Sequence, residues 1–128
     1  MYVCQPFPIS PRITPVAIVN LLQKTTCHRL ITTEVTLRAL VDGVKAELTA
    51  KDPEFKLAID EMPSLNEVYP KLGREQVDDP YKPYPQPTTR PPMTDIVLYL
   101  HSSGSTGLPK AIPQTHQTLA HWAAFRKL

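Results

Sequence analysis

The chain has 128 residues, which is enough for one small domain with a buried core. Its 14 Lys and Arg residues exceed its 12 Asp and Glu residues by two and are spread along the sequence, which argues against a nucleic-acid or anionic-membrane partner. No apolar run reaches membrane-spanning length, and the N-terminus lacks the pattern of a signal peptide. With Cys4 and Cys27 far apart and outside any CxxC pattern, these features predict a soluble, cytoplasmic protein with free thiols.

The first half of the sequence predicts two helices with a strand between them. Thr14 followed by Pro15 is typical of an N-cap and a first helical position, and apolar residues at helical spacing extend this helix to about Thr25. The short stretch from Arg29 to Thr33 predicts a strand. Aliphatic residues then recur at helical spacing from Glu34 to Leu48, so five apolar positions favour a second helix in spite of the helix-weakening Gly43.

The second half contains a long irregular region between shorter elements. A second apolar run covers Phe55 to Ile59, and Ser64 with Glu67 has the spacing of a capping box that begins a short helix. Fifteen prolines are many for this length, and residues 72–94, charged at first and then rich in proline, predict an internal loop rather than a central strand.

A continuous apolar run from Ile96 to Leu100 predicts a strand buried on both faces of a parallel sheet. Thr115 is the expected N-cap of a last helix that runs to the end of the sequence. Strands that alternate with helices predict an α/β fold: a parallel βαβ sheet with flanking helices, in which ligands bind at the carboxyl ends of strands.

The sequence SSGSTGLPK, from Ser102 to Lys110, directly follows this strand and has the chemistry of an anion-binding loop. Glycines at 104 and 107 let the backbone adopt positive φ and approach a ligand closely, so that successive N–H groups can converge on it. Serine and threonine hydroxyls add donors, and Lys110 adds a compact positive charge. The loop is not a Walker A motif, because Ala111 follows the lysine where that motif has serine or threonine.

The stretch YLHSSGSTGLPK resembles the signature loop of the AMP-forming acyl and aryl synthetases and the adenylation domains of peptide synthetases. Two flanking stretches, FPISPR at Phe7 to Arg12 and QTHQTL at Gln114 to Leu119, are also similar to this family. The sequences FPISPR and HSSGSTGLPK are most similar to those of adenylation domains of multidomain carboxylate reductases. Ala111 departs from the glycine common in the family, which affects the backbone freedom expected after Lys110.

The resemblance implies that residues 1–128 are part of the large N-terminal domain of an adenylate-forming enzyme, with residues 72–94 as an internal loop. In such enzymes a carboxylate attacks the α-phosphorus of ATP, with Mg²⁺ present, and pyrophosphate leaves. A carrier-protein domain is a further implied partner. The residues expected to grip the pyrophosphate end are Ser102, Ser103, Gly104, Ser105, Thr106, Gly107 and Lys110.

The family's downstream motifs, which supply the adenine, ribose and acyl pockets, are absent from this sequence, so no catalytic residue is assigned and turnover by the chain alone is not expected. Other interpretations remain open: a non-catalytic remnant that binds a nucleotide or a partner, a plain serine and glycine turn between two strands, or a docking segment at the PxxP spacing of Pro80 and Pro83. His28 and His101 have no metal-ligand partner at a suitable spacing, so no metal site is predicted.

Overall fold

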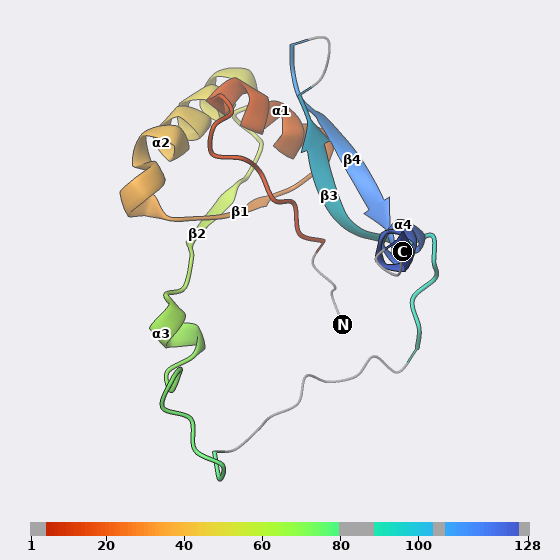
Figure 1. Ribbon diagram of the computed structural model, residues 1–128. Coiled ribbons are helices and arrows are strands. Elements are labelled where there is room, and N and C mark those ends of the chain that lie inside the picture. The colour runs from red at the N-terminus through yellow and green to blue at the C-terminus, as the bar shows by residue number, and fades with distance from the viewer. Residues whose placement is uncertain (1–4, 80–88, 104–106, 126–128) are drawn as a thin grey trace.

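The structure is a computed structural model, and it describes residues 5–79, 89–103 and 107–125. Helices alternate with strands through the first half of the chain, and a hairpin followed by a helix forms the second half (Figure 1). The elements are α1 (Pro15–Lys24), β1 (Arg29–Thr32), α2 (Glu34–Lys51), β2 (Ala58–Glu61), α3 (Leu65–Val68), β3 (Ile96–Ser102), β4 (Lys110–Thr115) and α4 (His116–Ala124).

The parallel βαβ unit predicted from the sequence is confirmed for β1, α2 and β2. The two strands pair in parallel, with Arg29 opposite Ala58 and Thr32 opposite Glu61. The second strand begins later than its apolar run: Phe55 and Leu57 precede the strand proper and pack against the helices. The chain is thus a mixed helix and strand structure with a small parallel sheet, in agreement with the expected α/β class.

The hydrophobic core lies between α1 and α2. Both helices begin close to the predicted positions, and the Thr14 side chain accepts a hydrogen bond from the Ala17 N–H, as expected of an N-cap. The buried hydrophobic residues of the described chain all belong to these two helices; they are Ala17, Ile18, Val19, Leu21, Leu22, Val41, Val44 and Leu48. The helices cover one face of the β1–β2 pair, and Ile31, which points to the other face, is 54% exposed.

Gly43 lies inside α2 because the two helices cross closely there. A Cβ atom at this position would lie 2.7 Å from Cγ of Pro15 and 3.3 Å from its Cβ. Real Cβ atoms do not approach carbon atoms this closely, so the glycine allows the first turn of α1 to contact α2. The packing of α1 against α2 compensates for the low helix propensity of glycine at this position.

The expectation for residues 96–100 was wrong in the direction of strand pairing and in the degree of burial. The strand exists, but it pairs antiparallel with β4, which the sequence did not predict, and all seven of its residues are half-buried rather than enclosed on two faces. An apolar run of this length is compatible with either kind of sheet, so the pattern alone does not determine strand direction. The loop therefore joins two strands of a hairpin instead of a strand and a helix.

Pro113 sits within β4 without breaking the hairpin. It lies opposite Tyr99, whose backbone N–H donates to the Pro6 carbonyl at 3.0 Å and so points away from β4. The Tyr99 and Pro113 pair is thus one of the positions of an antiparallel ladder that exchange no hydrogen bonds. The missing N–H of Pro113 faces the outer edge of β4, where proline is tolerated.

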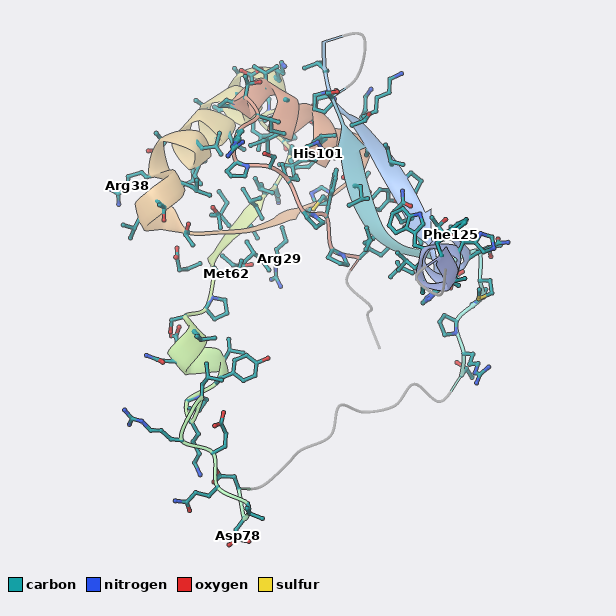
Figure 2. The ribbon with its side chains drawn as sticks, in the orientation of Figure 1. Arg29, Arg38, Met62, Asp78, His101 and Phe125 are labelled. Atoms are coloured by element: carbon teal, nitrogen blue, oxygen red, sulfur yellow. The ribbon has the colours of Figure 1, made fainter. Side chains whose placement is uncertain are left out.

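Residues 62–78 form an exposed arm that follows the βαβ unit (Figure 1). Every one of these residues is exposed, and Met62 and Asp78 are labelled near its two ends in Figure 2. The predicted capping box is confirmed at α3, where Ser64 and Glu67 each bind the other's backbone N–H. Local hydrogen bonds, rather than burial, give this arm its structure.

The last helix, α4, begins where the sequence predicted. Thr115 is its N-cap, and its side chain accepts a hydrogen bond from the Thr118 N–H at 3.2 Å. The residue before β3 also contacts the start of this helix, since the His116 N–H donates a hydrogen bond to the Asp95 carbonyl. Among the described residues, each helix is too short or too polar to span a bilayer.

Candidate phosphate-binding loop

Residues 103–109 connect β3 to β4 at the end of the hairpin that lies away from α4 (Figure 1). Of the predicted phosphate ligands, Gly104, Ser105 and Thr106 lie outside the described residues. The structure does place the residues on both sides of them, and these define the frame of the loop.

Ser102 and Lys110 are brought together by the last pair of the hairpin ladder. Directly opposed residues of antiparallel strands carry their side chains on the same face, about 4.5–5.5 Å apart at Cβ. The side chains of Ser102 and Lys110 therefore leave the backbone side by side at the base of the loop. Residues eight positions apart in the sequence become neighbours through a strand that the sequence did not predict.

The polar groups at this end of the hairpin are available to a ligand. Lys110 is exposed, and none of the ion pairs formed by the described residues involves it. Within the same part of the chain, the hydroxyls of Ser102 and Ser103 form no hydrogen bond. A cation and two hydroxyls without protein partners are donors that suit an anion.

Gly107 adopts a φ of +96°, a conformation that L side chains rarely take, and this agrees with the role predicted for a glycine here. A Cβ at this position would meet no atom within 4 Å, so open space surrounds the backbone. The requirement for glycine is therefore conformational, and the space beside it is free for a ligand to approach.

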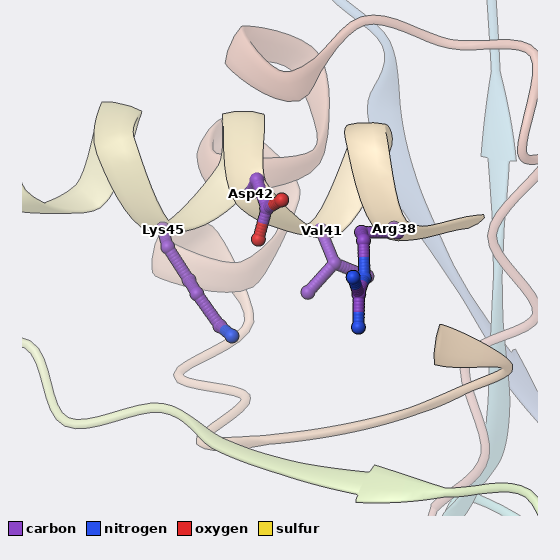
Figure 3. A pocket seen from close by; sticks show the side chains of 4 residues that line it. All are labelled: Arg38, Val41, Asp42 and Lys45. Atoms are coloured by element: carbon purple, nitrogen blue, oxygen red, sulfur yellow. The ribbon is translucent and has the colours of Figure 1, made fainter. Parts of the chain in front are cut away.

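Two hollows formed by the described residues lie away from this loop. One of about 220 Å³ runs along α2, where Figure 3 shows Arg38 and Lys45 extending in the same direction with Asp42 between them. The Asp42 carboxylate offsets part of the positive charge of these two exposed side chains, and no residue of the loop contributes to the hollow. A second hollow, of about 120 Å³, is largely apolar and lies within the core between α1, α2 and β1.

Two other polar residues that the sequence brought into question, His28 and Asp60, contact neighbouring residues of the fold. The His28 ring stacks on Phe55 with centroids 4.6 Å apart, and its Nδ1 lies 3.0 Å from the Lys56 carbonyl oxygen. Asp60 pairs with Arg29 at 3.0 Å. No group of three or more potential metal ligands occurs among residues 5–79, 89–103 and 107–125. The PxxP segment lies outside these ranges.

Two contacts at the base of the loop were missed by reasoning from the sequence. The His101 Nε2 atom accepts a hydrogen bond from the Ser10 N–H at 3.2 Å, and Asn20 Nδ2 donates to the Pro109 carbonyl at 3.4 Å. Both join residues about ninety positions apart, so no local pattern could reveal them. The stretches FPISPR and HSSGSTGLPK, which are far apart in the sequence, are therefore in contact in the fold.

Comparison with known proteins agrees with the resemblance of the loop. Residues 2–126 match the family of AMP-binding enzymes. Because this match covers nearly the whole sequence, the chain belongs to the AMP-binding enzyme family.

The curated relatives of this chain include two adenylate-forming reductases. The chain is 54% identical over 119 residues to the adenylate-forming reductase Nps11 of Serpula lacrymans var. lacrymans (strain S7.9), covering 93% of this chain and 10% of the relative. It is 39% identical over 117 residues to the adenylate-forming reductase Nps9 of the same fungus, covering 91% of this chain and 10% of the relative. The chain thus spans about a tenth of the length of these relatives, and no solved structure matches it significantly.

Proposed function

We propose that this chain supplies the ATP pyrophosphate-binding loop of an acyl-adenylate-forming enzyme that activates a carboxylic acid. The observation that carries the proposal is the base of the hairpin, where Ser102 and Lys110 are paired across the ladder and have no protein partner among the described residues. Gly107, at positive φ with open space beside it, extends this frame into the loop. Residues 1–128 are then a partial adenylation domain within a large N-terminal domain.

The loop residues would act on the β- and γ-phosphates. Hydroxyls of Ser102, Ser103, Ser105 and Thr106 and backbone N–H groups near Gly104 and Gly107 would donate hydrogen bonds to phosphate oxygens. Lys110 would offset their negative charge, and Mg²⁺ would enter bound to the same phosphates. Fixed donors of this kind lower the barrier by stabilising the charge on departing pyrophosphate. The chemical step itself is attack of the carboxylate oxygen on the α-phosphorus, with cleavage of the bond to pyrophosphate.

The length of the relatives supports the proposal that this chain would supply only some of the groups that bind the substrates. With about a tenth of their length present, this chain offers phosphate contacts, and the groups that hold adenine, ribose and the acid would come from further sequence. We therefore expect the 128-residue chain to bind magnesium pyrophosphate or ATP without forming an acyl-adenylate. In a complete enzyme, a carboxylic acid and a carrier-protein domain are the proposed partners.

The test is calorimetric titration of the chain with magnesium pyrophosphate. Saturable binding is expected, and Lys110→Ala should weaken it about ten- to a hundredfold, because one charge-assisted contact of this kind is worth about 1.5–3 kcal/mol. Lys45→Ala removes an equally exposed lysine from α2 and should leave the affinity unchanged. Equal effects of the two variants, or no saturable binding by the unaltered chain, would contradict the proposal.

A further inference from the structure

The phosphate-binding loop is fixed at both of its ends by side chains from remote parts of the sequence. At the outgoing end, His101 precedes Ser102 on β3 and contacts the N-terminal segment, residues 6–10. At the returning end, the Pro109 carbonyl precedes Lys110 and contacts Asn20 of α1. These contacts join the loop to two separate elements of the fold.

The contact of His101 defines its protonation. A backbone amide can only donate, so the Ser10 N–H at 3.2 Å requires Nε2 of His101 to be an unprotonated acceptor. The ring of Phe7 packs edge-on against His101, with ring centroids 6.4 Å apart, and in a tilted arrangement against Tyr99, with centroids 5.7 Å apart. Figure 2 shows His101 on the side of the hairpin that faces the N-terminal segment. The imidazole is thus both an acceptor and a packing surface.

The groups around His101 offer no carboxylate to an imidazolium. Residues 5–12, β3, β4 and α1 contain no Asp or Glu. Their charged side chains are those of Arg12, Lys24 and Lys110, all cationic and exposed, and their other titratable groups are Tyr99 and His101 itself. Protonation of Nε2 would convert it into a donor that faces the Ser10 donor, and the bond would be lost.

Asn20 has a comparable role at the other end. Asparagine is a weak helix former because its side chain competes for backbone groups, yet it occupies the middle of α1 between the buried residues Val19 and Leu21. Its amide reaches across to the carbonyl of Pro109, which is itself buried. Helix α1 thereby links the loop to the hydrophobic core.

We propose that His101 and Asn20 are positioning residues that hold the two ends of the phosphate-binding loop in the geometry that accepts a phosphate. This inference rests on the proposed function of the loop. Side chains alternate along a strand, so His101 and Ser102 point to opposite faces of β3, and His101 acts through the backbone rather than by touching the ligand. When the two ends of a loop are held in place in advance, they lose less conformational freedom as a ligand binds, which raises the affinity.

Three variants test the two anchors by titration with magnesium pyrophosphate. His101→Leu and Asn20→Leu remove the acceptor and the donor while keeping apolar bulk, and each should weaken binding about five- to tenfold. His101→Gln offers an amide oxygen near the position of Nε2 and should retain most of the affinity at pH 7.5. Equal losses in His101→Gln and His101→Leu would overturn the role assigned to the acceptor atom.

A measurement without ligand distinguishes failure of this inference from failure of the proposed function. Amide hydrogen exchange of Ser102 and Lys110, the last pair of the hairpin ladder, should be faster in the free chain of both leucine variants, while the core amides of Val19 and Val44 keep their protection. Unchanged exchange at Ser102 and Lys110 would overturn the anchoring role even if pyrophosphate binds. Faster exchange in a chain that binds no pyrophosphate would support the anchors and contradict only the proposed function.

Discussion

The helix pair and the hairpin are held together in different ways. All of the buried hydrophobic side chains of the described residues belong to α1 and α2, whereas within β3 and β4 the buried residue is the polar Gln114. The hairpin is attached by hydrogen bonds to residues 6–10 and to Asn20, and by the contact of Phe7 with Tyr99. The residues that stabilise the fold are therefore largely separate from the residues proposed to bind phosphate. Substitutions can alter the stability of the core without changing the proposed ligands, and the reverse.

The largest effect is expected in the helix pair. Leu22 is 1% exposed and packs in the core cluster, so Leu22→Ala should lower the free energy of unfolding by about 2–5 kcal/mol through lost burial and a cavity. Urea unfolding followed by far-ultraviolet circular dichroism measures the loss. Leu65→Ala, on the exposed arm, is the control and should change stability by less than about 0.5 kcal/mol. Similar losses in both variants would show that the core is not confined to α1 and α2.

A smaller effect is expected at the crossing of the helices. Gly43→Ala gains about 1 kcal/mol of helix propensity but forces Pro15 away from α2, which costs about 1–3 kcal/mol, so a net destabilisation of about 1 kcal/mol is expected. Asp42→Ala changes the exposed neighbouring position and should be neutral or slightly stabilising. Thermal unfolding of the two variants compares them directly, and a gain of stability in Gly43→Ala would contradict close packing against Pro15.

In the hairpin, the expected effect is measured as a loss of ligand affinity. Gly107→Ala places a Cβ on a residue with φ of +96°, which costs about 1–2 kcal/mol in the loop without any steric clash, and pyrophosphate affinity should fall about tenfold. Gly73→Ala is a matched control, since Gly73 also has positive φ and open surroundings but lies on the exposed arm. A loss of affinity in the control equal to that in Gly107→Ala would break the distinction between loop and arm.

The smallest effect concerns the arm, where the structure is local. The backbone N–H of Ser64 donates to the Glu67 carboxylate at 2.6 Å, which holds the pKa of Glu67 below its ordinary value. A lowered pKa means that the capping contact is present above the ordinary pKa of glutamate and is lost as pH falls through the lowered value. Nuclear magnetic resonance titration of Glu67 and of the Ser64 amide measures this, and Glu67→Gln should abolish the response. A Glu67 midpoint equal to that in the urea-unfolded chain would contradict it.

Local signals in the sequence predicted the parts of the structure that local interactions determine. The caps at Thr14, Ser64 and Thr115 are confirmed because each depends on a side chain and an N–H group three residues further on. The helix spacing of apolar residues is confirmed for α1 and α2 because both bury one continuous stripe. The resemblance to the AMP-binding family is confirmed as well.

The hairpin was less accessible to prediction because its determinants are remote in sequence. The strand β4 contains a proline and two strongly polar residues, and it exists because β3 presents a partner edge. The anchors of the loop depend on Ser10 and Asn20, which meet their partners only when the chain has folded. Two stretches that resemble the same family were visible in the sequence, but their mutual contact requires tertiary structure.

The separation between Ser10 and His101 has a consequence during synthesis of the chain. The two residues are 91 positions apart, and this length of chain must be made before the N-terminal segment meets its partner strand, which takes about 5–20 s at ordinary rates of translation. The βαβ unit has all of its own strands and helices within the first 61 residues and can form in this interval. During this interval Phe7 would have no aromatic partner, because Tyr99 and His101 are not yet synthesised. The nascent chain would therefore pass through a stage in which the core between α1 and α2 has formed but the N-terminal segment is not yet packed against β3.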